Sequence, residues 1–350
     1  MNDSEFSASR KRSEMRSSVG LSRRSLIGGA AAGVAAGISG LRSIRADAAD
    51  RPIRITATTP GSAGSVWRPS IAKLGPQATE GLQLEWIGSN PGQAQVQLAA
   101  GALDVSVFGA VGLATLVNRG SDIVLFGPAL NNHGRWIVRG DSPYRKPSDL
   151  IGKRIATQPE TTETYQQARV AASLIGIDLK RDVEVIFGPP TANLALFDRG
   201  DVDAVILLEP TATRLIGAGA REIARVGDMW REATGEPGDP FLVGLAAQRS
   251  WLESNRVLAS RIARLFAAAN GALRRNPQLF VELHSEIGIK DNEKAAIDLL
   301  PSRLADVYPV DWDASVWKVI DRQLDVAIRV GVLDKKPARP IYDAVPLDGV

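Results

Sequence analysis

The residues of this chain that could carry out chemistry are few and lie far apart in the sequence. The chain has no cysteine and two histidines, His133 and His284. The lack of cysteine excludes thiolate nucleophiles, thiolate metal sites and a disulfide framework. His133 and Glu209 could in principle act as base and acid. The sequence contains no HExxH, GxSxG or P-loop motif and no clustered His and Asp with metal-ligand spacing. It therefore predicts no catalytic set, no metal and no cofactor.

Polar and small residues follow several predicted strands, where helix N-termini would present free backbone N–H groups to a ligand. In the first part of the chain the candidate ligand contacts are Thr59, Gly61, Asn90, Gln93, Phe108 and Gly109. Thr59 and Gly61 either cradle an anion or only turn the chain. Asn90 could be no more than an N-cap before Pro91, and Phe108 could belong to the core. A small residue at Gly109 would let a ligand approach the backbone.

A second group of candidate ligand contacts comes from the middle of the chain. It consists of Asn132, Arg135, Thr161, Thr162, Pro190 and Glu209. Thr161 and Thr162 stand at a predicted helix start, where they either contact the ligand or only cap the helix. Glu160 and Glu163 are expected to satisfy the positive end of that same helix.

Arg135 and Glu209 are the two charged candidates, and each allows two interpretations. Arg135 is either a bidentate clamp for a carboxylate or sulfonate or a surface arginine beside a buried Trp136. Glu209 could bind a ligand amine, but we expect it to face the dipole of the helix that follows.

Apolar segments of β type alternate with helical patterns from residue 51 to residue 249, which is typical of βα units with mainly parallel sheets. We expect strands at 53–58, 82–87, 105–108, 123–126, 136–138, 154–157, 183–187, 204–208, 222–226 and 242–246. Helices are expected at 93–100, 110–118, 165–175 and 194–199. Glycines suited to left-handed C-caps close them, namely Gly101, Gly120, Gly176 and Gly200. After residue 249 the pattern is helical.

Two segments of the sequence repeat one pattern. Residues 99–107 and 196–205 both show a helix end, a glycine, an apolar residue followed by aspartate, and a strand. The repetition predicts that the same βαβ unit occurs once in each of two lobes.

The first 48 residues have the three parts of an export signal. Basic residues lead to the pair Arg23-Arg24, an uncharged segment spans 26–41, and Ala46-Asp47-Ala48 has a small-x-small form. The paired arginines indicate the twin-arginine export machinery, with general secretion as the alternative. The uncharged segment is shorter than the ~20 residues that span a bilayer. We expect cleavage after Ala48 and a soluble periplasmic protein without a lipid anchor.

The positive charge of the chain belongs to this segment. The whole sequence has a net charge of +3, and residues 1–48 hold eight Lys or Arg and four Asp or Glu. Their removal would leave a net charge of −1. A near-neutral chain lacks the basic surface that nucleic-acid binding requires, so no nucleic-acid partner is expected.

A series of motifs occurs in a characteristic order between residue 52 and about residue 335. They are Ala100-Gly101 with Asp104-Val105, then 149–156 (DLIGKRIA), Gly176-Ile177-Asp178, 200–204 (GDVDA), Glu209-Pro210 and the helical segment 317–331. This series resembles the nitrate/sulfonate/taurine-binding proteins of ABC importers. The resemblance implies an α/β, type II-like, two-lobed periplasmic binding protein. Each lobe would hold a mostly parallel sheet flanked by helices, with a helical C-terminal part packed on the first lobe.

The resemblance also implies a division of the chain and a function. The first lobe would comprise residues 49–137 and 245–350 and the second 138–244, with hinges at 132–141 and 237–242. A monomer would close on one small, anionic organic solute and deliver it to an ABC permease and its ATPase. The alternatives are an enzyme of the same fold that acts on a carboxyl-bearing precursor and a periplasmic solute sensor.

Overall fold

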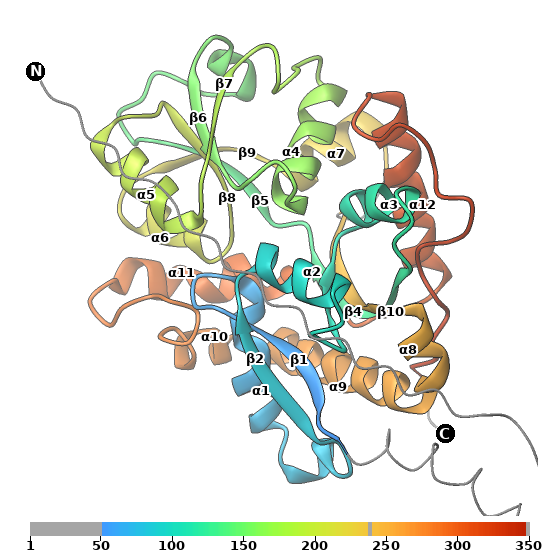
Figure 1. Ribbon diagram of the computed structural model, residues 1–350. Helices are drawn as coiled ribbons and strands as arrows, with labels where there is room; N and C mark the ends of the chain where they lie inside the picture. Colours follow the sequence, from blue (N-terminus) through green and yellow to red (C-terminus); the bar gives the residue numbers. More distant parts are fainter. Residues whose placement is uncertain (1–50, 237–239, 348–350) are drawn as a thin grey trace, which may run out of the picture. The chain divides into compact units, whose positions relative to one another are not determined.

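Figure 1 shows the computed structural model of the protein, which describes residues 51–236 and 240–347. The predicted export signal and its cleavage site lie outside the described residues. None of the helices in the described ranges is long and apolar enough to cross a membrane. The described residues belong to one compact unit, in which two groups of strands position the candidate site.

The first group of strands forms two small sheets joined by an isolated bridge. β1 (Ile53–Thr58) pairs in parallel with β2 (Leu84–Ser89). β10 (Phe241–Gln248) pairs antiparallel with both β3 (Ser106–Phe108) and β4 (Ile123–Asn131). A parallel bridge between Ile55 and Val105 connects β1 to the segment that enters β3. The combined order is β2-β1-β3-β10-β4, and we call these strands with the helices packed on them the first lobe.

The second group of strands forms one five-stranded sheet, in which equivalent strands follow each other in the same order as in the first lobe. Its strands are β7 (Glu184–Phe187), β6 (Arg154–Thr157), β8 (Ala204–Leu208), β5 (Gly134–Val138) and β9 (Arg221–Arg225), in the order β7-β6-β8-β5-β9. β6 is parallel to β7 and β8, whereas β5 is antiparallel to β8 and β9. We call this sheet with its helices the second lobe. In each lobe one antiparallel strand therefore takes the fourth place in this order. It is β10 in the first lobe and β5 in the second.

The repeated sequence pattern lies at equivalent places in the two lobes. Asp104 precedes β3 and accepts a hydrogen bond of 2.9 Å from the backbone N–H of Arg54, next to the start of β1. Asp203 precedes β8 and accepts one of 2.9 Å from the N–H of Arg154, at the start of β6. Both aspartates fix the beginning of the neighbouring parallel strand. The repeated aspartate therefore has a structural role.

The helices cover the sheets of both lobes (Figure 1). The α-helices are α1 (Trp67–Lys73), α2 (Pro91–Ala99), α3 (Ala110–Asn118), α4 (Glu163–Leu174), α5 (Pro190–Arg199), α6 (Thr211–Gly217), α7 (Val226–Thr234), α8 (Arg249–Ser254), α9 (Arg256–Arg275), α10 (Gln278–Glu282), α11 (Lys294–Leu304) and α12 (Ala314–Arg329). The 3-10 helices are η1 (Ala63–Val66), η2 (Pro76–Thr79), η3 (Pro147–Leu150) and η4 (Ala305–Val307).

The expected α/β class and most expected elements are confirmed. β1, β6, β8 and α3 have the predicted bounds, and the four C-cap glycines have φ between 72° and 98°. The prediction was wrong for the length of β4, which continues beyond Phe126 to Asn131. Pro128 argues against a strand interior, but here it lies opposite Gly244, where β10 changes register. The irregular pairing accommodates the proline.

The C-terminal helices pack mainly on the first lobe, as the resemblance implied. α9 contacts α1 and β4, and α12 contacts α3 and β10. Trp67 of α1 packs against Phe266 of α9 with ring centroids 5.2 Å apart, and its indole N–H donates to Asn270 at 3.1 Å. α11 departs from this pattern because it also contacts α6 of the second lobe.

Several polar contacts join the two lobes. Thr211 donates its hydroxyl hydrogen to the carbonyl of Gly61 at 3.0 Å, and Arg214 of α6 pairs with Glu293 beside α11 at 2.8 Å. The chain crosses between the sheets twice, from β4 to β5 and from α7 to β10. The proposed division at residues 137/138 and 244/245, with hinges at these crossings, stays a prediction.

Candidate functional site

A small cavity of about 60 Å³ lies where the two lobes meet, and we call it the inner cavity. The ends of β1, β4 and β8 and the start of β10 line it, together with η1, α2 and the N-terminal turn of α4. Ligands of open α/β sheets bind at such strand ends. The lining residues are Thr58, Ser62, Gly64, Trp67, Gln95, Val107, Leu130, Gln158, Thr162, Glu163, Thr164, Leu208, Leu242 and Val243.

The walls of the inner cavity are apolar, and its polar groups are mainly hydroxyls and amides. No lysine or arginine is among the lining residues, and Glu163 is the one carboxylate among them. The hydroxyl of Thr58 is buried and has no hydrogen-bond partner among the described residues, and Thr58 is 9 % exposed. A buried polar group without a partner costs free energy, so this hydroxyl is available to a ligand.

Glu163 of the second lobe reaches into the first lobe. Its two carboxylate oxygens accept hydrogen bonds from the backbone N–H groups of Val111 at 3.3 Å and Gly112 at 3.1 Å, in the first turn of α3. Gln167 donates to Glu163 at 2.7 Å, and Gln323 of α12 donates to Gln167 at 3.1 Å. Gly109, the residue before α3, has no side chain that could cap the helix. The carboxylate of Glu163 therefore caps α3 from the other lobe.

This arrangement corrects the expected role of the two glutamates. Glu163 was expected to satisfy the start of α4, but it binds the start of α3 instead. Glu160 pairs with Lys180. Burial raises the pKa of Glu163 to about 7, although the hydrogen bonds from Gln167, Gly112 and Val111 act in the opposite direction. The free-energy cost of burying the ionised carboxylate thus exceeds the stabilisation that its three hydrogen-bond donors provide.

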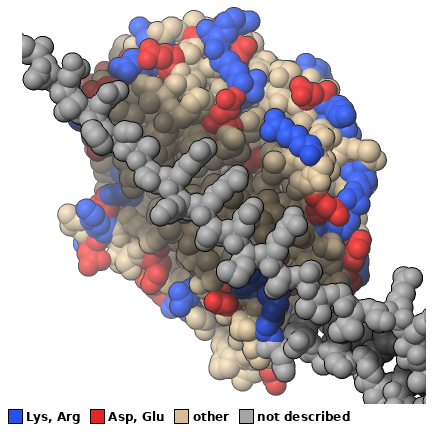
Figure 2. Space-filling model, viewed as in Figure 1, with Lys and Arg blue, Asp and Glu red and all other residues tan. Residues whose placement is uncertain are grey.

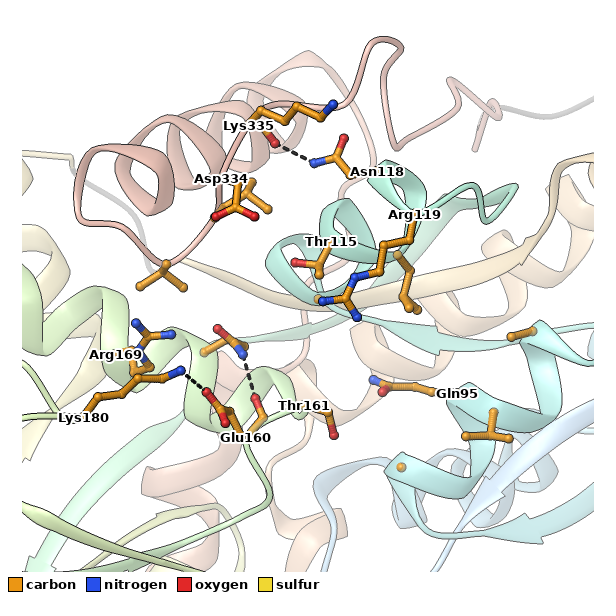
Figure 3. A pocket seen from close by; sticks show the side chains of 18 of the residues that line it. Gln95, Thr115, Asn118, Arg119, Glu160, Thr161, Arg169, Lys180, Asp334 and Lys335 are labelled. Atoms are coloured by element: carbon orange, nitrogen blue, oxygen red, sulfur yellow. Dashed lines mark hydrogen bonds and ion pairs between the residues drawn. The ribbon is translucent and has the colours of Figure 1, made fainter.

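A larger cavity of about 960 Å³ opens next to the inner cavity, and we call it the outer cavity (Figure 3). Gln95 lines both cavities, and Thr161 of the outer cavity directly precedes Thr162 of the inner one. In Figure 3, Gln95 and Arg119 come from the first lobe, and Glu160, Arg169 and Lys180 come from the second. Each cavity is therefore built from both lobes.

Cationic side chains outnumber acidic ones around the outer cavity. Its charged lining residues are Arg119, Arg169, Lys180, Lys335, Glu160 and Asp334. Within this set, Glu160 pairs with Lys180. On the face shown in Figure 2, basic and acidic side chains are interspersed. The excess of cations at the outer cavity would attract an anionic solute.

Of the first-lobe candidates, Gly109 lies against Glu163, which lines the inner cavity. A Cβ atom on Gly109 would lie 2.1 Å from the carboxyl carbon of Glu163. Asn90 and Gln93 are exposed and cap α2 through reciprocal hydrogen bonds of 3.0 and 3.3 Å. Thr59 is exposed, Gly61 accepts from Thr211, and Phe108 is 1 % exposed in the core. The capping and core interpretations account for the placement of Asn90, Gln93 and Phe108.

Of the second-lobe candidates, Thr162 lines the inner cavity and Thr161 the outer one. Thr162 precedes α4 but makes no side-chain cap, because its hydroxyl donates to the carbonyl of Pro159 at 2.7 Å. Pro190 is the first residue of α5 and lines neither cavity.

Asn132, Arg135 and Glu209 lie together, but outside both cavities. Glu209 is fully buried and accepts from Thr213 at 2.9 Å, from Arg303 of α11 at 2.6 Å and from Arg135 at 3.3 Å. Asn132 and Arg135 line a separate cavity of about 200 Å³. Arg135 is 8 % exposed rather than a surface residue, and its Nε atom pairs with Glu209 and Glu222; its expected role as a clamp stays a prediction. Glu209 faces α6, as expected, and also joins this ion network.

His133 does not form an acid–base pair with Glu209 in the described structure. Its Nδ1 atom lies 2.7 Å from the carbonyl oxygen of Asn131. Burial lowers the pKa of His133 to about 3. The imidazole is therefore neutral at physiological pH.

The sequence pattern missed several residues of the two cavities. Gln95 lies two positions after the candidate Gln93, and a helix turns these side chains to different sides. Trp67 lies in a helix that was not expected, and Arg119 and Arg169 gave no motif. No local signal identified them, because only the packing of the lobes brings these residues together.

Comparisons with known proteins agree with this fold. A family model described as "NMT1/THI5 like" matches residues 75–278, more than half of the chain. The alkanesulfonate-binding protein SsuA from Xanthomonas axonopodis pv. citri, solved with bound MOPS, superposes with a TM-score of 0.69 at 19% identity, covering 84% of this chain and 98% of that one. At this identity the likeness shows the fold alone, a two-lobed α/β architecture.

Two curated relatives match shorter stretches and carry different names. The taurine-binding periplasmic protein of Escherichia coli is 30% identical over 138 residues, 39% of this chain and 42% of that protein. An ATP phosphoribosyltransferase from Nitratidesulfovibrio vulgaris is 33% identical over 135 residues, 36% of this chain and 41% of that protein. The chain thus spans less than half the length of these relatives.

Proposed function

Because the chain belongs to the NMT1/THI5-like family, we propose that it is the extracytoplasmic solute-binding component of an ABC importer. The observation that carries this proposal is the pair of adjacent cavities built from both lobes. A solute held there would contact both lobes at once, and its binding free energy would favour their closed arrangement. The closed protein would deliver the solute to a membrane permease and its ATPase. The predicted twin-arginine leader fits this location.

We propose a small anionic organic solute, such as a sulfonate or a carboxylate. Four cationic side chains line the outer cavity against two acidic ones, and free N–H groups at helix starts favour negative charge. The names of the sulfonate- and taurine-binding relatives support the same class.

A thermal-shift panel tests the solute class. We expect taurine, alkanesulfonates, MOPS or small carboxylates to raise the melting temperature. Spermidine and divalent cations should not raise it. A solute at 100 times its dissociation constant stabilises the protein by about 2.7 kcal/mol. Calorimetry should then give one solute per chain, recovered unchanged. A polyamine or metal ion as the best stabiliser would contradict the proposed charge of the site.

The second candidate function is transfer of a phosphoribosyl group to ATP, which the names of four partial relatives favour. Consumption of ATP in the presence of a phosphoribosyl donor, above one turnover per chain, would support the enzyme. A sensory role would use the same binding step, and it differs in the membrane partner that recognises the closed protein.

A further inference from the structure

The carboxylate of Glu163 occupies a place suited to the anionic group of a solute. It accepts hydrogen bonds from the N–H groups of Val111 and Gly112 in the first turn of α3. The place exists because residue 109 is glycine, where a Cβ would lie 2.1 Å from the carboxyl carbon. The first N–H groups of a helix have no partner within the helix and attract anions.

The size of the inner cavity indicates that one of its residues must move when a solute enters. Its volume is about 60 Å³, whereas pockets for small molecules are typically about 300–1,000 Å³. Glu163 is the lining residue whose place an anion could take without loss of hydrogen bonds. The unpartnered hydroxyl of Thr58 lines the same cavity and would gain an acceptor.

We propose that Glu163 is a built-in competitor of the solute, which holds the start of α3 when no solute is bound and is displaced by the solute's anionic group. This inference rests on the proposed function and adds a selection rule to it. A solute must satisfy Val111 and Gly112 better than the protein's own carboxylate does. A metal ion or an ammonium group has no acceptor to offer there, so it leaves Glu163 in place.

Displacement of Glu163 should release a proton below neutral pH. The effects on its pKa are burial and hydrogen bonds from Gln167 of α4 and the backbone of α3. No charged side chain contributes from these elements, and α12 and β10 add Gln323 and the carbonyl of Phe241. In the packed lobes the pKa is about 7, against an ordinary value of 4.5. Displaced into water, Glu163 returns toward the ordinary value and loses its proton between these two pH values.

The sign of the pH dependence follows. Between about pH 4.5 and 7 the displaced form binds fewer protons, so solute affinity should rise with pH by up to about tenfold per unit. Above pH 7 it should level off. Propanesulfonate is the suitable probe, because its sulfonate stays ionised over this range and it has no other titrating group. Calorimetry on the unmodified protein at pH 5, 6, 7 and 8 measures the affinity, and a flat profile would overturn the proposal.

Glu163→Gln fixes this side chain in an uncharged form, and Glu184→Gln is its matched control. Glu184 lies in β7, pairs with Arg154 and is 66 % exposed. We expect Glu163→Gln, whose uncharged side chain imitates the protonated glutamate, to bind propanesulfonate at pH 8 at least about tenfold more weakly than the unmodified protein, because it lacks the ionisation in water that favours displacement. Its affinity should not vary between pH 5 and 7, whereas the control should keep the profile of the unmodified protein. Equal affinities and profiles in all three proteins would refute the competition.

A solute-free measurement separates this inference from the proposed function. In the unliganded protein, amide hydrogen exchange at Val111 and Gly112 should quicken at least about tenfold in Glu163→Gln and stay unchanged in Glu184→Gln. Unchanged exchange in both variants would show that Glu163 does not hold α3 in solution. If propanesulfonate binds none of the proteins, the proposed solute class fails, and the exchange rates alone decide whether Glu163 occupies this place.

Discussion

At the scale of single residues, two buried glutamates of the second lobe make polar contacts with the first. Glu163 contacts backbone N–H groups of α3, whereas Glu209 contacts the guanidinium of Arg303 at 2.6 Å. Arg303 also pairs with Glu222 at 2.7 Å. Buried charges remain in proteins when they are paired. The two contacts differ in their donors. Neutral backbone N–H groups bind Glu163 and could bind another anion in its place, whereas Glu209 forms an ion pair with Arg303.

The pairing of Arg303 leads to a prediction about stability. Arg303→Met would leave Glu209, which is fully buried, without its closest charged partner. We expect the free energy of unfolding to fall by about 3–5 kcal/mol, as for other buried pairs that lose one member. The control is Lys73→Met, which breaks the exposed pair of Lys73 with Glu282 (45 % and 49 % exposed) and should cost less than about 1 kcal/mol. Urea denaturation measures both, and similar losses would contradict the structural role of the Arg303 pair.

At the scale of secondary-structure elements, helix starts divide into those capped locally and those left for other partners. Asn90 and Gln93 cap α2 within the same loop. α3 and α4 have no side-chain cap of their own. α3 receives Glu163 from the other lobe, and the first turn of α4 borders the inner cavity. The first turns of α3 and α4 therefore present N–H groups at the site that need acceptors from elsewhere.

This division predicts opposite effects for two alanine variants. Asn90→Ala should lower the free energy of unfolding by about 1 kcal/mol, the usual value of an N-cap, and leave the affinity for propanesulfonate within about twofold. Thr162→Ala should instead weaken binding by about 1–3 kcal/mol through a lost hydrogen bond. Calorimetry and urea denaturation distinguish the two effects. Weakened binding in Asn90→Ala would return the α2 loop to the list of ligand contacts.

At the scale of the whole molecule, the two lobes have the same sheet order, and each sheet contains one strand that follows an element of the other lobe in the chain. β5 follows β4 of the first lobe directly in the chain and enters the second sheet, and β10 follows α7 of the second lobe and enters the first. The two crossings leave the lobes linked by two short segments. A hinge needs only a few such positions, so the proposed closure requires no change within either sheet.

The lack of cysteine allows a direct measurement of closure. Ser148 of η3 in the second lobe and Ser254 of α8 are exposed, and cysteines placed there can carry a pair of fluorophores. We expect energy transfer to rise when saturating propanesulfonate closes the lobes. A pair at Gln83 and Ser254, both exposed on the first lobe, should not respond. No change in the pair that spans the lobes would contradict hinge closure on the solute.

The sequence by itself determined the α/β class, the positions of the strands and the C-cap glycines. These features depend on local patterns, namely side-chain alternation, β-branched segments and the backbone freedom of glycine, so neighbouring residues suffice to predict them. The repeated aspartates also revealed the internal similarity of the lobes, because Asp104 and Asp203 act on adjacent strands.

Only the tertiary structure decided which residues share the site. Glu163 and Gly112 are separated by 51 residues, and Glu209 and Arg303 by 94, and no local pattern predicts such contacts. A threonine or asparagine at a helix start looks the same in sequence whether it caps that helix or binds a ligand, because the hydroxyl or amide is suited to both. The packing of the lobes placed Asn90 on the surface and left the hydroxyl of Thr58 without a hydrogen-bond partner among the described residues.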